Sequence, residues 1–179
     1  MKEFNKNIVL VGLMGAGKTR VGREISMILD MPFIDADREI ENAAGCSVQE
    51  IFEMYGEQGF REGELRVIER LLQEGPMVLA TGGGAFINEK TRENIKESSV
   101  SVWLRADLDL LVERTGRTNH RPLLQNTDPK KVLQELMNKR DPIYAQADIT
   151  VECKAKITPR AMGHVVVDAV QNYLAGEQE

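Results

Sequence analysis

The residues with the clearest chemical signature are Gly12–Thr19, which read GLMGAGKT and match the pattern G-x-x-x-x-G-K-[ST]. Glycines let backbone N–H groups turn inward around an anion, and the N-terminus of a following helix adds partial positive charge. Lys18 supplies a full charge, and Thr19 offers a hydroxyl to Mg²⁺. The motif therefore predicts a nucleotide-phosphate site made by Gly15, Ala16, Gly17, Lys18 and Thr19.

This phosphate motif alone leaves the class of protein open between a kinase, a GTPase and an ATP-driven machine. The sequence contains no Asn-Lys-x-Asp motif for reading guanine, and 179 residues are too few for a typical motor domain. A kinase of small molecules is favoured. A nucleotide-binding regulatory module without turnover is the alternative from a different class, because a fold does not fix a function.

Two carboxylates follow the second predicted strand, at Asp35 and Asp37. At the carboxyl end of a strand they project over the crevice where α/β proteins bind ligands. One could support a Mg²⁺ shell while the other accepts a proton from an acceptor hydroxyl. The alternative is that Asp37 only caps the next helix.

Further candidates are an arginine beside an aromatic ring, Arg61 after Phe60, and the run Gly82–Gly84 after a predicted strand. A guanidinium recognises a carboxylate through paired hydrogen bonds, although a lone arginine on a helix more often pairs with a neighbouring glutamate such as Glu57 or Glu64. Three glycines at a strand end indicate backbone closely approached by a ligand, and a plain tight turn is the alternative.

The elements that must position these residues alternate between short apolar runs and amphipathic stretches, which favours a parallel sheet covered by helices on both faces. Strands are predicted at 7–11, 32–34, 78–80, 100–104 and 148–151, and helices at 17–29, 37–43, 48–55, 62–72, 107–114, 129–137 and 159–174. No repeat or linker interrupts residues 1–179, so a single α/β domain is expected.

The composition narrows the partners. With 42% hydrophobic residues the chain can bury a core unaided, and a net charge of −5 without a basic face argues against nucleic acid. The sequence contains no run of about 18 apolar residues, so no membrane span is predicted. Cys46 and Cys153 fit no metal-binding spacing and are expected to be free, and a cytoplasmic monomer is the default expectation.

Taken in order, the motifs resemble those of one family, the shikimate kinases. The matching segments cover nearly the whole chain: GLMGAGKT, DAD at Asp35–Asp37, GEQGFREGE at Gly56–Glu64, ATGGG at Ala80–Gly84, RPLL at Arg121–Leu124 and KRDPIY at Lys139–Tyr144. The resemblance implies the fold of nucleoside-monophosphate kinases, with a five-stranded parallel sheet in three layers and a mobile lid at about 115–127.

The resemblance also assigns expected roles. Lys18 and Thr19 would serve the phosphates of ATP and Mg²⁺, with Asp35 holding the metal through water. Asp37 would bind the acceptor hydroxyl. The shikimate carboxylate would be held by two arginines and the substrate ring contacted by the glycine run. These residues are Arg61, Arg140, Gly82, Gly83 and Gly84.

At the nucleotide side, Arg121 would reach the transferring phosphate from the lid, while Arg114 would stack on adenine with Pro159 on its other face. Arg117 and His120 have no matching role and are expected to be solvated. The implied reaction is ATP-dependent phosphorylation of the 3-hydroxyl of shikimate, which yields 3-phosphoshikimate and ADP on the route to chorismate and aromatic amino acids. A sugar-acid kinase such as a gluconate kinase is the runner-up. A nucleoside-monophosphate kinase would need a second base pocket, for which the sequence gives no clear signal.

Overall fold

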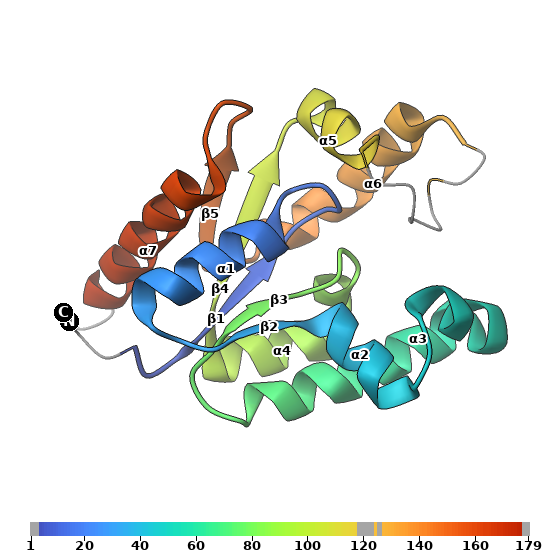
Figure 1. The fold of residues 1–179 in the computed structure, drawn as a ribbon, viewed down its shortest axis with the longest axis horizontal. Helices are drawn as coiled ribbons and strands as arrows, with labels where there is room; N and C mark the ends of the chain where they lie inside the picture. The colour runs from blue at the N-terminus through green and yellow to red at the C-terminus, as the bar shows by residue number, and fades with distance from the viewer. Residues whose placement is uncertain (1–3, 118–123, 125–126, 177–179) are drawn as a thin grey trace.

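Five parallel strands form one sheet in the computed structural model, which describes residues 4–117, 124 and 127–176 (Figure 1). The strand order is β2-β3-β1-β4-β5. Every residue of the central strand β1 is buried, as its apolar run predicts. The strands are β1 (Asn7–Val11), β2 (Phe33–Asp35), β3 (Val78–Ala80), β4 (Ser99–Ala106) and β5 (Ile149–Cys153).

Helices cover both faces of this sheet. The helices α1 and α7 pack against each other on one face, and α3, α4 and α6 lie on the other (Figure 1). The three-layer α/β fold expected from the alternation is therefore confirmed. The helices are α1 (Lys18–Leu29), α2 (Ala36–Ala44), α3 (Val48–Leu72), α4 (Glu89–Ser98), α5 (Leu108–Thr115), α6 (Pro129–Tyr144) and α7 (Pro159–Gly176), with a 3₁₀ turn η1 at Ala85–Ile87.

The strand order explains how distant motifs meet. Strands β2, β3 and β1 are neighbours, with Asp35 opposite Ala80 and Leu10 opposite the same residue from the other side. Because parallel strands present their carboxyl ends at one edge, the segments that follow these three strands gather there. Those segments are the DAD motif, the triple glycine and the phosphate motif.

The helix that carries Arg61 begins earlier than predicted. Helices were expected at 48–55 and 62–72, and the break after residue 55 is confirmed, because Gly56 inside α3 (Val48–Leu72) leaves helical geometry (φ 68°, ψ −178°) and kinks the helix. The second segment resumes directly after Gly56 and not at residue 62. A capping box between Ser47 and Glu50 fixes its start. Three glycines in this stretch weaken the helical signal locally, yet packing of the second half against the core makes Arg61 a helix residue.

Two further departures lie downstream. The helix α4 and the turn η1 were not predicted, and α6 continues past the expected end at Met137 to Tyr144, with Pro142 inside it. The mean polarity of α4 hides its two buried residues, Thr91 and Ile95, from a periodicity argument. The extension of α6 matters because it sets Arg140 and Tyr144 one turn apart on one helix face.

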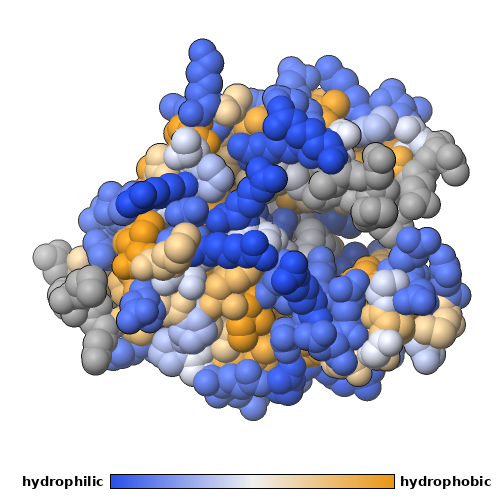
Figure 2. Space-filling model, in the orientation of Figure 1, coloured by the Kyte–Doolittle hydropathy of each residue, from blue (hydrophilic) through white to orange (hydrophobic). Residues whose placement is uncertain are grey.

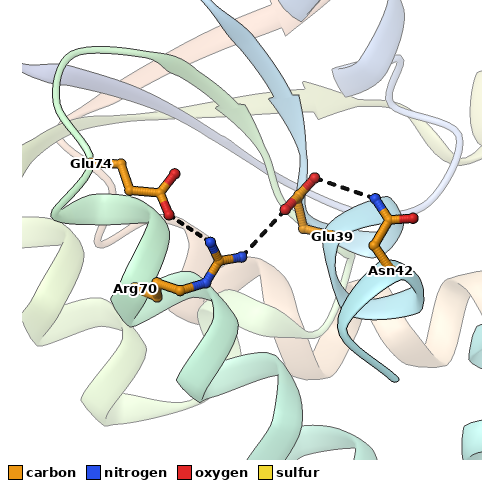
Figure 3. Close-up of polar contacts among 4 residues, drawn as sticks. All are labelled: Glu39, Asn42, Arg70 and Glu74. Atoms are coloured by element: carbon orange, nitrogen blue, oxygen red, sulfur yellow. Dashed lines mark hydrogen bonds and ion pairs between the residues drawn. The ribbon is translucent and has the colours of Figure 1, made fainter. Parts of the chain in front are cut away.

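A surface ion pair joins α2 to the C-terminal end of α3. Figure 3 shows Arg70 between Glu39 of α2, at 3.3 Å, and Glu74, at 2.5 Å, while Asn42 donates to Glu39 at 3.5 Å. These groups are largely solvated, so the pair contributes little stability, in the range of about 0–1 kcal/mol. The two helices it joins also contact each other directly, and both contribute side chains to the pocket described below.

Within the described residues, no helix combines the length and apolar character required to cross a membrane. Both cysteines are free, as expected, with Cys153 buried and Cys46 half-buried.

Candidate active site

A pocket of about 1110 Å³ opens along the carboxyl edge of the sheet. Figure 2 shows this face hollowed between the part that carries α5 and the part that carries α2 and α3. Every predicted site residue that the structure describes lines the pocket or directly adjoins it. We call Gly12–Thr19, Arg114 and Pro159 the nucleotide half, and Asp37, Arg61, Gly82–Gly84 and Arg140 the acceptor half. Arg121 and His120 lie outside the described residues, as does most of the expected lid at 115–127.

The phosphate motif closes into a tight loop at the start of α1. Gly17 caps the helix in the left-handed region (φ 97°), a conformation that glycine adopts without strain. The buried Lys18 Nζ donates to the carbonyl oxygens of Gly12 at 2.7 Å and Leu13 at 2.9 Å. The lysine thus spans the mouth of the loop, and a phosphate group would compete with these carbonyls for its protons.

Asp35 is the cap of α2, which resolves the alternative raised for Asp37. Its Oδ1 accepts from the backbone N–H of Asp37 at 3.1 Å, and its Oδ2 accepts from Thr19 Oγ1 at 2.8 Å. The interpretation of Asp37 as a helix cap is therefore wrong. Thr19 and Asp35 form a pair of hard oxygen donors beside the phosphate loop, the kind of ligand Mg²⁺ takes together with phosphates and water. In the described ranges no group of three or more His, Cys, Asp or Glu side chains could enclose a metal alone.

Asp37 occupies a largely desolvated position in the acceptor half. Burial raises the pKa of its carboxyl above the usual value, and the nearby charge of Asp35 raises it further, while Lys18 and Arg61 oppose the shift. Its Oδ1 would lie only 2.8 Å from a Cβ added to Gly82. A carboxylate with a raised pKa is a better proton acceptor than an ordinary one, because its basicity lies closer to neutral pH.

Arg61 enters the same pocket from α3 and is held by carboxylates on its own helix. Its Nη1 lies 2.7 Å from Glu64 Oε2 and its Nη2 lies 3.6 Å from Glu57 Oε1. Its Cζ sits 5.1 Å from the centre of the Phe60 ring. The alternative of a paired arginine was right about the partners, but the side chain is only 23% exposed and lines the pocket. Pairing and pocket lining therefore occur together.

The backbone of Gly82–Gly84, which we call the glycine floor, lies against the side chains of Arg61 and Arg140. A Cβ on Gly84 would overlap the Arg61 guanidinium, and one on Gly83 would come within 3.7 Å of Arg140 Nη1. The alternative of a tight turn is confirmed, because the N–H of Ala85 donates to the carbonyl oxygen of Gly82 at 3.2 Å, and the turn continues directly into η1. A side chain at Gly84 would therefore displace the Arg61 guanidinium, whereas one at Gly83 would make only ordinary van der Waals contact with Arg140.

Glu64 is a site residue that sequence reasoning missed. Its side chain is 2% exposed, and its Oε1 is buried without a hydrogen-bond partner among the described residues. Burial raises the pKa of its carboxyl, and the Arg61 charge opposes that shift. A Cβ on Gly82 would lie 3.0 Å from this oxygen and 2.8 Å from Asp37 Oδ1, so both carboxylates face one small region. The i, i+3 spacing from Arg61 was the available signal.

At the nucleotide end, the pocket is lined by Arg114 of α5, Cys153 at the end of β5 and Pro159 at the start of α7. Arg114 Nη1 donates to the carbonyl oxygen of Ala16 at 3.1 Å, so this arginine also supports the phosphate loop. Arg117 is 72% exposed and pairs with Glu113, which agrees with the solvated role expected for it.

A strand, phosphate loop and helix lie at the edge of a five-stranded parallel sheet and adjoin a pocket with two arginines and a half-buried aspartate. Together they define a P-loop kinase of small molecules. The family model described as "Shikimate kinase" matches residues 14–171. The chain belongs to the shikimate kinase family.

Individual relatives agree with this. A shikimate kinase from Mesorhizobium japonicum is 54% identical over 147 residues, which are 82% of this chain and 72% of the relative. A crystal structure of shikimate kinase from Acinetobacter baumannii in complex with shikimate superposes with a TM-score of 0.91 at 39% identity, covering 95% of both chains. A gluconokinase from Sinorhizobium meliloti, 21% identical with a TM-score of 0.59 over 97% of this chain and 99% of its own, shares the fold alone.

Proposed function

We propose that this protein transfers the γ-phosphoryl group of ATP to the 3-hydroxyl of shikimate, giving ADP and 3-phosphoshikimate on the route to chorismate and aromatic amino acids. The observation that carries the proposal is that two guanidinium groups and the half-buried carboxylate of Asp37 share one pocket with the phosphate loop. The family and the shikimate bound to the Acinetobacter relative support the choice of substrate.

The acceptor half fits a small ring with one carboxylate and several hydroxyls. Arg61 and Arg140 would hold the carboxylate through paired, charge-assisted hydrogen bonds. The backbone of Gly82–Gly84 would contact the ring from below. Asp37 would accept a hydrogen bond from the reacting hydroxyl, orient its oxygen and take up its proton as the bond to phosphorus forms.

The nucleotide half would bind the phosphates of ATP. Lys18 would exchange its bonds to Gly12 and Leu13 for phosphate oxygens and thereby neutralise charge that moves during transfer. Thr19 would ligate Mg²⁺ directly and Asp35 through water; the ion, when bound, supplies charge neutralisation at the phosphates. Arg114 and Pro159 would enclose the adenine.

Arg121 and the segment 115–127 complete the proposal. We infer that this segment closes over the phosphates and excludes water, and that Arg121 then contacts the transferring group. Arg121→Ala would in that case lower kcat strongly while leaving shikimate binding nearly unchanged. A kcat within about tenfold of the original would contradict the role, because such arginines contribute about 10³–10⁵ in rate.

The proposed function is tested by ADP release from ATP with shikimate, with gluconate and without acceptor. Among these conditions, turnover is expected only with shikimate, because a pair of guanidinium groups and the Asp37 carboxylate select polar groups of the acceptor by their position. Preferential turnover of gluconate would make the protein a sugar-acid kinase. Binding of ATP without turnover of either acceptor would indicate a regulatory module. Sedimentation in the same buffer tests the single-domain monomer, which we also propose.

A further inference from the structure

The largest fully buried side chain among the described residues, Tyr144, lies directly beneath the acceptor half. It stands in the last turn of α6, four residues after Arg140, so both side chains project from one face of the helix. Its ring is held between Trp103, at 5.8 Å between ring centres, and Phe86, at 6.5 Å. These contacts fix the direction of its hydroxyl.

The Tyr144 hydroxyl has a defined direction, because it donates its only proton to the carbonyl oxygen of Gly83. Arg140 lies beside the same residue, since its Nη1 would be 3.7 Å from a Cβ on Gly83. Its positive charge acts on the Tyr144 hydroxyl, whose oxygen keeps its acceptor capacity free for a guanidinium donor. Arg140, Tyr144 and Gly83 therefore form one cluster at the floor of the pocket. Burial raises the pKa of Tyr144 to about 12, so its proton stays in place.

The hydrogen bond to the Gly83 carbonyl oxygen also fixes the orientation of the peptide group between Gly83 and Gly84. A trans peptide is planar, so its N–H points opposite to its carbonyl. With the Gly83 oxygen directed at Tyr144, the N–H of Gly84 is directed away from the aromatic cluster. Gly84 is also the residue on which the Arg61 guanidinium rests. The hydroxyl of Tyr144 therefore influences both arginines, Arg140 directly and Arg61 through the glycine floor.

We propose, building on the proposed function, that Tyr144 is a positioning residue for the acceptor carboxylate, because its hydroxyl bonds the Gly83 carbonyl oxygen and thereby holds the Gly82–Gly84 backbone beside Arg140 and Arg61 in one geometry. Tyr144 does not touch the substrate in this arrangement. Its effect is carried by Arg140 and by the backbone it bonds, so its loss should weaken acceptor binding selectively.

The test is Tyr144→Phe, which keeps the ring between Trp103 and Phe86 and removes only the hydroxyl. We expect the KM for shikimate to rise about tenfold, in line with losing the hydrogen bond to Gly83. The KM for ATP and kcat should stay within about threefold. Emission from Trp103, the only tryptophan, should be unchanged if the packing is preserved.

A matched control is Tyr173→Phe in α7, which removes a hydroxyl bonded to Asp148 at 3.3 Å. This control should leave both KM values unchanged. A double-mutant cycle adds a readout that a purely structural role would not move: in an Arg140→Met background, Tyr144→Phe should change kcat/KM for shikimate by less than it does alone.

Several outcomes would overturn the positioning role. These are a shikimate KM within twofold of the original, an equal rise in both KM values, full additivity in the cycle, or failure of Tyr144→Phe to fold. The original protein is assayed first. If it does not phosphorylate shikimate, the proposed function fails; if it does and the variant is unaffected, only the role of Tyr144 fails.

Discussion

The two halves of the pocket are built in different ways. The nucleotide half depends mainly on eight consecutive residues, Gly12–Thr19, whose backbone and one lysine form the phosphate loop. The acceptor half collects side chains and backbone from α2, α3, the segment after β3, and α6. The first is a local structure that its own sequence specifies. The second exists only once the sheet has brought four separate segments together.

The halves also differ in electrostatics. The phosphate loop offers N–H groups and Lys18 to an anion, and no buried acid lies within it. The acceptor half contains Asp37 and Glu64, whose pKa values are both raised mainly by burial. Burying a carboxylate costs free energy, so the polar arrangement of the acceptor half lowers the stability of the folded protein. Substitutions in the two halves should therefore have separable consequences.

The largest separation is expected for Asp37→Asn. An amide can still hydrogen-bond the acceptor hydroxyl but cannot take up its proton, so kcat should fall by about 10²–10⁴. Binding of ATP should be unchanged, because the phosphate loop does not depend on this carboxyl. Steady-state turnover at saturating shikimate, together with ATP titration, measures both. Turnover within about threefold of the original would show that Asp37 only binds.

Arg61→Lys is expected to separate the halves through affinity. The substitution keeps the charge but loses the forked geometry and the bond to Glu64, so shikimate binding should weaken by about ten- to a hundredfold. ATP binding should barely change. Calorimetric titration of each ligand measures the two affinities, and Arg70→Lys on the far end of α3 is the control. Equal weakening of both ligands would place Arg61 outside the acceptor half.

Gly84→Ala should affect the acceptor half only through a steric clash. The added methyl group would displace the Arg61 guanidinium, so we expect a rise of about tenfold in the KM for shikimate and little change in melting temperature. Gly63→Ala is the matched control in α3, since a Cβ there meets nothing within 4 Å. That control should keep its KM and gain up to about 1 kcal/mol of stability from helix propensity. Similar KM values for both variants would contradict the proposed floor.

Much of the fold could be predicted from sequence because β1, β2 and β3 are short runs with a glycine or proline at or near one end. The run Asn7–Val11 and the following motif define β1 and α1 almost to the residue. Helix α4 was missed because only Thr91 and Ile95 of its ten residues are buried, too few to show a period. The early start of the second segment of α3 was missed because glycine propensity argues locally against a helix that tertiary packing supports.

The site could be predicted where the type and sequence context of a residue indicate its chemical role. Lysine in a glycine loop and aspartates after a strand are such cases. Glu64 and Tyr144 could not be assigned in this way, because their importance lies in burial and in the partners they hold. A glutamate three residues from an arginine and a tyrosine in a helix are common on ordinary surfaces. Only the assembled fold shows that Glu64 lies beside Gly82 and that the Tyr144 hydroxyl bonds the next residue, Gly83.

The smallest expected effect concerns stability and again uses Asp37→Asn. Because the pKa of Asp37 is raised in the folded state, the folded protein binds more protons than the unfolded chain at pH values between the ordinary value of 3.8 and the raised one. The stability contribution of this group therefore falls as pH rises through that window, and the ionised carboxyl is a liability at neutral pH. Removing it should raise Tm by a few degrees at pH 7, and the gain should shrink as pH falls towards 4 and vanish below it.

Asp168→Asn, at an exposed position in α7, is the control and should show no such trend. Melting curves from pH 4 to pH 8 measure the difference. A lower Tm for Asp37→Asn at neutral pH would mean that attraction to Lys18 and Arg61 outweighs the cost of burial.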